Sequence, residues 1–333
     1  MAGPDHSRNR TIDIARGIAI LAIIVGHFGI FTVNRVVYTF HVPIFYVITG
    51  YFMKRYPLPA FIRRKARTLL VPYLVTCVIV ILLSAAITAF SSGNVLSDIA
   101  KWTKASLYGA GSAYKIPVEP IGAIWFLLAS FWGGLFLQIS LRWNKYLRIL
   151  WDVSLFLLGW FTSRQFFWFP LSIQAGCCAT LFMYVGYCVK HISQRKKMVT
   201  GIVAFVLWIS FILTFRSFYL VRNDFGMGLL DIVRSFAGCY CVLLISEGAE
   251  KITDEGSKIL SWMGRNSIII LCVHLVEMNL VDWWQVVDKL AEIGIPHPVG
   301  EAAAVGIKLI VIFGFSVLLL MSKTGRKLFG IKN

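Results

Sequence analysis

Charged residues, and acidic ones above all, are scarce in this chain. Only 15% of its 333 residues are charged, and 16 Asp and Glu stand against 33 Lys and Arg. Soluble domains carry about 25% charged and about 45–50% apolar residues. This chain is 58% hydrophobic, with a mean hydropathy of +0.73. The composition excludes an ordinary soluble domain and indicates a membrane protein.

Three other signals are missing, and each absence argues against a class of protein or of site. The seven Cys fall within predicted helices, and pairs such as Cys177-Cys178 do not have metal-site spacing, so we expect neither zinc nor a disulfide framework. No internal repeat is evident, which disfavours inverted-repeat transporters. No small-residue cleavage site follows the first apolar stretch, so we expect a retained anchor rather than a cleaved signal peptide.

Long apolar runs are what the sequence has in abundance. A membrane-spanning helix needs about 20 apolar residues. We therefore predict an all-α, polytopic integral membrane helical bundle of about ten transmembrane helices, forming a single membrane-embedded domain over residues 1–333. The predicted spans are 12–32, 36–53, 69–90, 121–139, 149–163, 170–189, 199–217, 227–246, 266–282 and 302–322, of which the fifth is short.

The basic residues predict how the helices are oriented. With the N-terminus inside, 22 of the 33 Lys and Arg lie in cytoplasmic segments, as the positive-inside rule expects. We predict cytoplasmic tails at 1–11 and 323–333 and an extracytoplasmic loop at 91–120. The net charge of +17 then reflects topology beside anionic lipid and requires no nucleic acid. We expect a multi-pass protein of the cell inner membrane.

Polar residues inside the first predicted span form one stripe. Asp13, Arg16 and His27 share a helix face, since the eleven steps from Arg16 to His27 make about three turns. Charged residues in a bilayer core are expensive and usually face a cavity or a partner. Asp13 and Arg16 are spaced to form a pair. Alternatively, both residues have only a structural role: the Arg16 side chain extends to the membrane–water interface, and His27 forms a hydrogen bond with a neighbouring helix.

The next two predicted spans add a histidine and an arginine pair. In the second span, His41 lies near the outer end, followed by Pro43 in the first turn. Two imidazoles at a similar depth, His27 and His41, suit an acid/base site or two satisfied core positions. Arg64 and Arg67 project from one face at the start of the third span, where they suit phosphates or act as a basic anchor.

Two further polar pairs lie inside the predicted spans, and a transporter and a sensor or scaffold are the alternative classes of protein. His274 and Glu277, three residues apart, form either a second acid/base element or a structural hydrogen bond, and Asp231 is spaced to pair with Arg234. A secondary transporter would use such residues as a proton relay or substrate site. A membrane sensor or scaffold without turnover would leave the polar stripe and the arginine pair unexplained.

Together these residues resemble the acyltransferase-three family of membrane O-acyltransferases. That family has an Arg, ten residues and a His in its first helix, which here is RGIAILAIIVGH (16–27). Four more segments match the family in order. In the segment 40–52, Thr49 stands where the family usually has Ser. They are FHVPIFYVITGYF (40–52), RRKARTLLVPYL (63–74), IWFLLASF (124–131) and GRNSIIILCVH (264–274).

The resemblance implies transfer of an acyl group, usually acetyl, from cytoplasmic acyl-CoA to a hydroxyl of a carbohydrate or glycolipid acceptor. It implies His27 as general base with Arg16 and His41 beside it, and Arg64, Arg67 and Arg16 as the acetyl-CoA site. Asp13, Trp125, His274 and Glu277 are assigned to substrate binding, and no metal is expected. Candidate oxyanion donors are Trp125, His41 and Asn266.

Some alternatives stay open at the level of the sequence. His27 either acts directly as a base or relays the acyl group as an acyl-histidine; direct transfer requires fewer steps. The acceptor, the acyl chain and the oligomeric state are left open. A different membrane acyltransferase class would fit the chemistry, but the early Arg–His motif favours the family named above, and the secondary transporter remains the alternative from another class.

Overall fold

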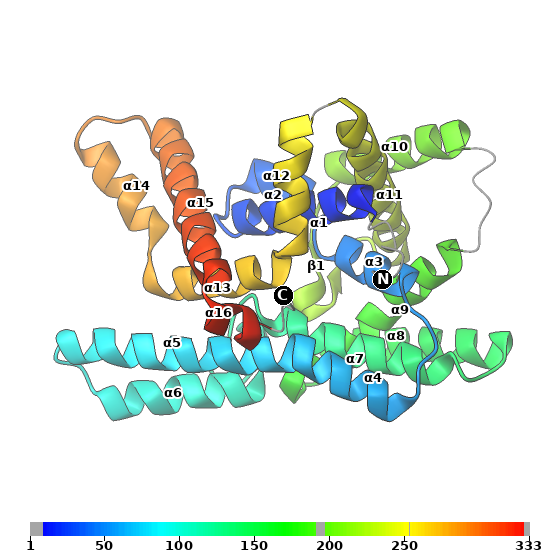
Figure 1. The fold of residues 1–333 in the computed structure, drawn as a ribbon, viewed down its shortest axis with the longest axis horizontal. Coiled ribbons are helices and arrows are strands. Elements are labelled where there is room, and N and C mark those ends of the chain that lie inside the picture. The colour runs from blue at the N-terminus through cyan, green and yellow to red at the C-terminus, as the bar shows by residue number, and fades with distance from the viewer. Residues whose placement is uncertain (1–8, 191–196, 253, 330–333) are drawn as a thin grey trace, which may run out of the picture. The chain divides into compact units, whose positions relative to one another are not determined.

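A computed structural model describes residues 9–190, 197–252 and 254–329 (Figure 1). Of the predicted tails, residues 1–8 and 330–333 lie outside this range. A short pair of strands, β1 (Phe218–Tyr219) and β2 (Asp224–Phe225), is the only sheet in the described chain. All other elements are helical: α1 (Arg10–Gly26), α2 (Phe31–Val37), α3 (Pro43–Tyr51), α4 (Leu58–Lys65), η1 (Ala66–Leu70), α5 (Val71–Phe90), α6 (Val95–Tyr108), α7 (Trp125–Ser140), α8 (Lys145–Gln165), η2 (Pro170–Ser172), α9 (Ile173–Val189), α10 (Lys197–Leu213), η3 (Leu220–Arg222), α11 (Leu229–Ile252), α12 (Asp254–Arg265), α13 (Ser267–Leu280), α14 (Trp283–Glu292), α15 (His297–Met321) and α16 (Lys323–Leu328).

The all-α prediction is confirmed, and several helices suit a membrane. In the described chain, four helices are long and apolar enough to cross a bilayer, and a fifth is added if α12 and α13 together make one span. Other apolar helices, such as α7 with 16 residues and α10 with 17, are shorter. The chain is therefore a multi-pass membrane protein, while the number ten and the cytoplasmic termini stay predictions. The four helices are Leu58–Phe90, Pro170–Val189, Leu229–Ile252 and His297–Met321.

The first two predicted spans need correction. The first helix, α1, ends at Gly26 rather than at residue 32, and Gly29 takes a positive φ of 91° in the turn that follows. The second span is not one helix, because α2 ends at Val37 and α3 begins at Pro43. Proline has no N–H to continue a helix and restricts the residue before it, so the helix restarts at Pro43.

The third predicted span is longer than expected and contains a π-helical turn. Helices α4, η1 and α5 run continuously over 33 residues. In η1, the Val71 N–H bonds to the carbonyl of Ala66. Pro72 cannot donate to a carbonyl four residues earlier, and the wider turn accommodates it. Turns of this kind are frequent at functional sites, and this one contains Arg67.

The segment 91–120, predicted as a loop, contains a helix. Asn94 caps α6 by accepting the Ser97 N–H at 3.0 Å, and Gly109, with φ of 69°, ends it. Figure 1 shows α6 lying antiparallel beside α5. The Tyr73 hydroxyl, on α5, donates to the Ser106 carbonyl at 2.6 Å. This segment is thus a packed amphipathic helix followed by an irregular stretch.

The chain divides into two compact units, which are described separately below. Unit 1 comprises Met1–Tyr51, Gly186–Phe218 and Phe225–Ser267. It contains α1, α2, α3, α10, α11 and α12. Unit 2 comprises Phe52–Val185, Tyr219–Asp224 and Ile268–Asn333. It contains α4 to α8, most of α9, and α13 to α16.

Candidate functional site

The N-terminal end of α1 in unit 1 is tied down by side chains. Asn9 caps the helix by accepting the Ile12 N–H at 3.1 Å. Arg10 donates to the Ser257 hydroxyl at 2.5 Å, and the Thr11 hydroxyl donates to the carboxylate of Glu250. These bonds reach α12 and α11, so the helix that carries the Arg–His motif is anchored on two sides.

Helix α1 then touches α12 backbone to backbone through two glycines. A Cβ built on Gly17 would lie 2.0 Å from the carbonyl oxygen of Leu260, and one on Gly264 would lie 1.8 Å from that of Asp13. No side chain fits at such distances. Small residues let membrane helices approach this closely, and here the contact lies directly beside Asp13 and Arg16.

Asp13 and Arg16 lie on the part of α1 that faces this contact. Asp13 is 4% exposed, and Arg16, one turn further on, is half-buried. A carboxylate this deep requires polar partners, because an isolated buried charge is costly. The predicted pair between Asp13 and Arg16 stays a prediction.

His27 lies just beyond α1 rather than within it, at the C-cap position. Its ring nitrogen Nδ1 lies 2.8 Å from the carbonyl oxygen of Ile23. Since a carbonyl only accepts, Nδ1 carries the proton, and in a neutral ring Nε2 is then the proton acceptor. The side chain is half-buried. His27 is therefore a fixed imidazole whose accepting nitrogen is Nε2.

His41 lies in the turn between α2 and α3 and is oriented in the same way. Its Nδ1 donates to the carbonyl of Val37 at 2.7 Å, and its ring meets that of Tyr38 edge-on, with centroids 4.7 Å apart. The Trp208 indole holds this turn by donating to the Thr39 hydroxyl at 2.8 Å. A neutral His41 in this tautomer presents an acceptor at Nε2, so it does not suit the role of an oxyanion donor.

Arg64 and Arg67 belong to unit 2, at the end of α4 and in η1. Both side chains are exposed. The Arg64 guanidinium lies 5.3 Å from the ring centre of Tyr56. No acidic residue occurs between Asp13 and Asp98 in the sequence, so the segment that carries the two arginines contributes only basic charges. Arginine forks on such a surface suit phosphate groups.

Trp125, also in unit 2, is the first residue of α7 and is buried. A Cβ on Gly111 would lie 2.1 Å from Cδ1 of its indole. The irregular stretch after α6 therefore packs directly against Trp125, and only a glycine fits at position 111.

Asn266 is another predicted oxyanion donor. Its side-chain amide donates a hydrogen bond to the Trp262 carbonyl at 2.8 Å.

His274 and Glu277 meet, as their spacing predicted. His274 Nδ1 lies 3.1 Å from Oε2 of Glu277, and both residues are buried on α13 in unit 2. The other carboxylate oxygen, Oε1, accepts from Lys308 Nζ at 3.2 Å and from the indole N–H of Trp283. Every oxygen of this carboxylate is thus engaged, which favours the structural hydrogen bond over an acid/base role.

Two members of that cluster, Lys308 and Trp283, were not expected from the sequence. Lys308 lies inside the last predicted span, is 2% exposed and forms an ion pair with Glu277. A lone lysine in an apolar stretch indicates a buried acidic partner, but the partner of Lys308 lies 31 residues away in the sequence.

The predicted pair of Asp231 and Arg234 is confirmed. Oδ1 of Asp231 lies 3.7 Å from Nη1 of Arg234.

The predicted site residues thus fall into two sets. Unit 1 holds Asp13, Arg16, His27, His41 and Asn266, and unit 2 holds Arg64, Arg67, Trp125, His274 and Glu277. Within unit 1, α1 carries Arg16 next to its backbone contact with α12, and the oriented imidazole of His27 follows at the C-cap of the same helix. These features define a multi-pass membrane protein with polar residues held inside its helical framework.

The family follows from the sequence as a whole. The model of the acyltransferase domain family, acyltransferase-three, matches residues 9–321, so the chain belongs to this family and is an acyltransferase. The resemblance inferred from the motifs is confirmed, and the match gives the transporter alternative no support. No curated protein and no solved structure matches the chain.

Proposed function

We propose that this membrane acyltransferase moves an acetyl group from cytoplasmic acetyl-CoA to a hydroxyl of a carbohydrate or glycolipid acceptor at the cell inner membrane, with His27 as general base. One observation carries the proposal. The Nδ1–H bond from His27 to the Ile23 carbonyl makes Nε2 the proton acceptor of a neutral ring, at the C-cap of the helix that carries Arg16.

The chemistry requires such a base. A sugar hydroxyl is a weak nucleophile at neutral pH and needs a base within hydrogen-bond reach. His27 Nε2 takes the hydroxyl proton while the oxygen attacks the thioester carbonyl carbon. The new C–O bond forms, the C–S bond breaks, and the leaving sulfur of CoA receives the proton from the imidazolium. The imidazole is neutral again after each transfer.

Arginines supply the donor site in this proposal. CoA carries several phosphates, and Arg64 and Arg67 are exposed on a surface without acidic neighbours in the sequence. Bidentate arginine contacts with phosphate are stronger than neutral hydrogen bonds. Arg16 holds the pantetheine end or orients the reacting groups, His41 belongs with His27 to the catalytic set, and Asp13 binds the acceptor.

The donor is tested first, because the test requires no knowledge of the acceptor. Purified protein is titrated with acetyl-CoA, and the wild type is compared with Arg64→Ala/Arg67→Ala. A matched control, Arg55→Ala/Arg63→Ala, removes two other exposed arginines from the same segment. Since hydrogen bonds to charged groups contribute about 1.5–3 kcal/mol, we expect affinity to fall at least about tenfold in the first variant only.

Two results would contradict this assignment. Equal losses in both double variants would reduce the arginines to a diffuse basic anchor. An absence of saturable binding to folded wild-type protein would exclude acetyl-CoA as the donor, and longer acyl-CoA donors would then be titrated in the same assay.

A further inference from the structure

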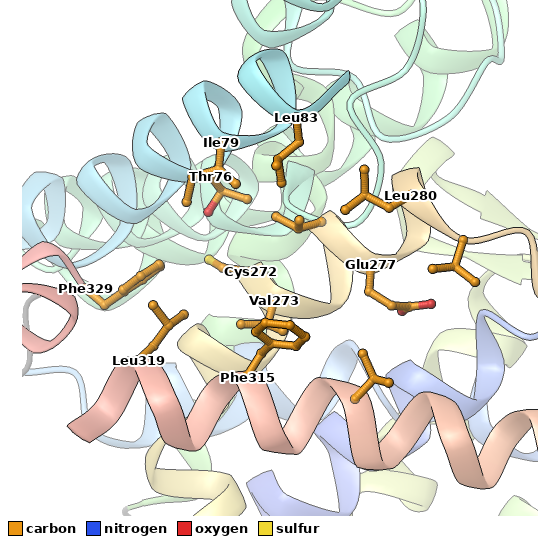
Figure 2. A pocket seen from close by; sticks show the side chains of 13 residues that line it. Thr76, Ile79, Leu83, Cys272, Val273, Glu277, Leu280, Phe315, Leu319 and Phe329 are labelled. Carbon is orange, nitrogen blue, oxygen red and sulfur yellow. The ribbon is translucent and has the colours of Figure 1, made fainter. Parts of the chain in front are cut away.

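A cavity of about 450 Å³ lies within unit 2, between α5, α13 and α15. This volume is within the range of about 300–1,000 Å³ typical of ligand sites. Figure 2 shows the cavity extending along α13, with Phe329 and Leu319 toward one end and Glu277 and Leu280 toward the other. The acyl-transfer chemistry proposed above does not use it.

The walls of the cavity suit hydrocarbon. Apart from Thr76, Cys272 and Glu277, every lining residue is an aliphatic or phenylalanine side chain. The Thr76 hydroxyl already donates to the Pro72 carbonyl at 2.8 Å, and both Glu277 oxygens accept hydrogen bonds within the protein. A water molecule needs two to four polar partners, so the cavity does not suit water.

The cavity opens sideways toward the surface of the spanning helices. Its wall includes Leu83 and Phe315, which are 38% and 58% exposed on α5 and α15. Both helices belong to segments long and apolar enough to cross a bilayer. In a membrane this opening faces lipid chains, and an empty space would forfeit dispersion contacts. A lipid chain can therefore enter directly from the bilayer.

Charge is concentrated at the Phe329 end of the cavity. Helix α16, which separates Leu319 from Phe329, carries Lys323, Arg326 and Lys327. It folds back tightly on α15, because a Cβ on Gly325 would lie 2.3 Å from the Leu319 carbonyl oxygen. No acidic residue follows Glu301 in the sequence. The three basic side chains of α16 therefore favour an anionic group at this end.

We propose that this cavity binds one acyl chain of an anionic membrane phospholipid, whose phosphate headgroup lies against the basic face of α16. The chain runs along α13 toward Leu280, and its end meets only apolar atoms because the Glu277 carboxylate is closed off by its own partners. The proposal does not depend on the acyl-transfer function.

The test uses full-length protein in phosphatidylcholine nanodiscs that contain a trace of phosphatidylglycerol with a diazirine in one acyl chain. After illumination, cross-linked peptides are identified by mass spectrometry. Val311→Trp fills the cavity from α15, and Val276→Trp fills it from α13. Ile310→Trp is the matched control, since Ile310 is the neighbour of Val311 but is 74% exposed and does not line the cavity.

We expect wild-type label on α13 and α15, and a fall of about tenfold in both filling variants, which corresponds to a loss of about 1.4 kcal/mol in binding, with little change in Ile310→Trp. Thermal unfolding of each variant checks that it is folded. Equal labelling of the filling variants and the control would overturn the site. Label confined to residues outside the cavity would do the same.

The headgroup is tested by a second comparison. Lys323→Gln/Lys327→Gln is expected to lower labelling by the phosphatidylglycerol probe but not by a phosphatidylcholine probe with the same chain. Lys104→Gln/Lys145→Gln, which removes two other exposed lysines of unit 2, serves as control. Equal labelling by both probes in wild-type protein would overturn the anionic headgroup. Displacement of the probe by palmitoyl-CoA, but not by unlabelled phosphatidylglycerol, would assign the cavity to the donor instead.

Discussion

His27 in unit 1 and His274 in unit 2 are both histidines with a hydrogen-bonded Nδ1, but their surroundings differ. His27 is half-buried and donates to a backbone carbonyl. His274 is fully buried and bonds to a carboxylate that a lysine and an indole also hold. The first arrangement orients the imidazole that we propose as the base, whereas the second is part of a cluster in which both carboxylate oxygens accept hydrogen bonds. Burial of a histidine therefore does not by itself indicate a catalytic role, and its hydrogen-bond partners have to be compared.

The sharpest test of this comparison is substitution of each histidine in turn. A positioned general base typically contributes about 10²- to 10⁴-fold, so His27→Ala is expected to lower the rate of acyl transfer by that factor and to leave acetyl-CoA affinity nearly unchanged. His274→Ala is expected to reduce thermal stability more than the rate per folded molecule. Transfer by His27→Ala at the wild-type rate would remove His27 as the base.

The next largest effect is expected in the closed cluster. Glu277→Ala leaves Lys308 buried without its carboxylate partner, and breaking a buried ion pair costs about 3–5 kcal/mol. Unfolding in detergent should show this loss. Glu277→Ala/Lys308→Met should recover much of it, because the uncompensated charge is gone. A double variant no more stable than Glu277→Ala would contradict the idea that the unpaired charge causes the loss.

The smallest effect concerns the backbone contact that positions the Arg–His helix. Gly264→Ala forces α1 and α12 apart, and overpacking of this kind costs about 1–3 kcal/mol. Activity should fall together with stability in a transfer assay and a melting curve. Gly248→Ala is the control: its added Cβ meets no atom within 4 Å in the described chain, and alanine suits a helix better than glycine. Equal effects of the two substitutions would show that the close contact is not critical.

Much of the fold was predictable because its signals are local. A bilayer-spanning helix needs about 20 apolar residues, so long apolar runs predict helices, and each predicted stretch contains a helix in the structure. The errors occurred at glycine and proline. The first helix stops at Gly26 and the next full helix restarts at Pro43, since backbone hydrogen bonds, rather than hydropathy, decide where a helix ends.

The candidate site was predictable to the extent that its residues share one helix. Arg16 and His27 are related by helical geometry alone, and so are His274 and Glu277. The tautomer of His27 was not predictable, because it depends on the carbonyl that Nδ1 meets at the end of α1. The family match over residues 9–321 adds the activity but not the roles of individual residues.

The sequence by itself determined that this chain is a helical membrane protein, because composition and periodicity are properties of neighbouring residues, and its Arg–His spacing and the family match over residues 9–321 identified it as an acyltransferase. Only the tertiary structure decided that Lys308 closes the Glu277 cluster, that Gly17 and Gly264 bring α1 against α12, and that α5, α13 and α15 leave a cavity between them. These features join residues far apart in the chain, and long-range packing decides which of them meet.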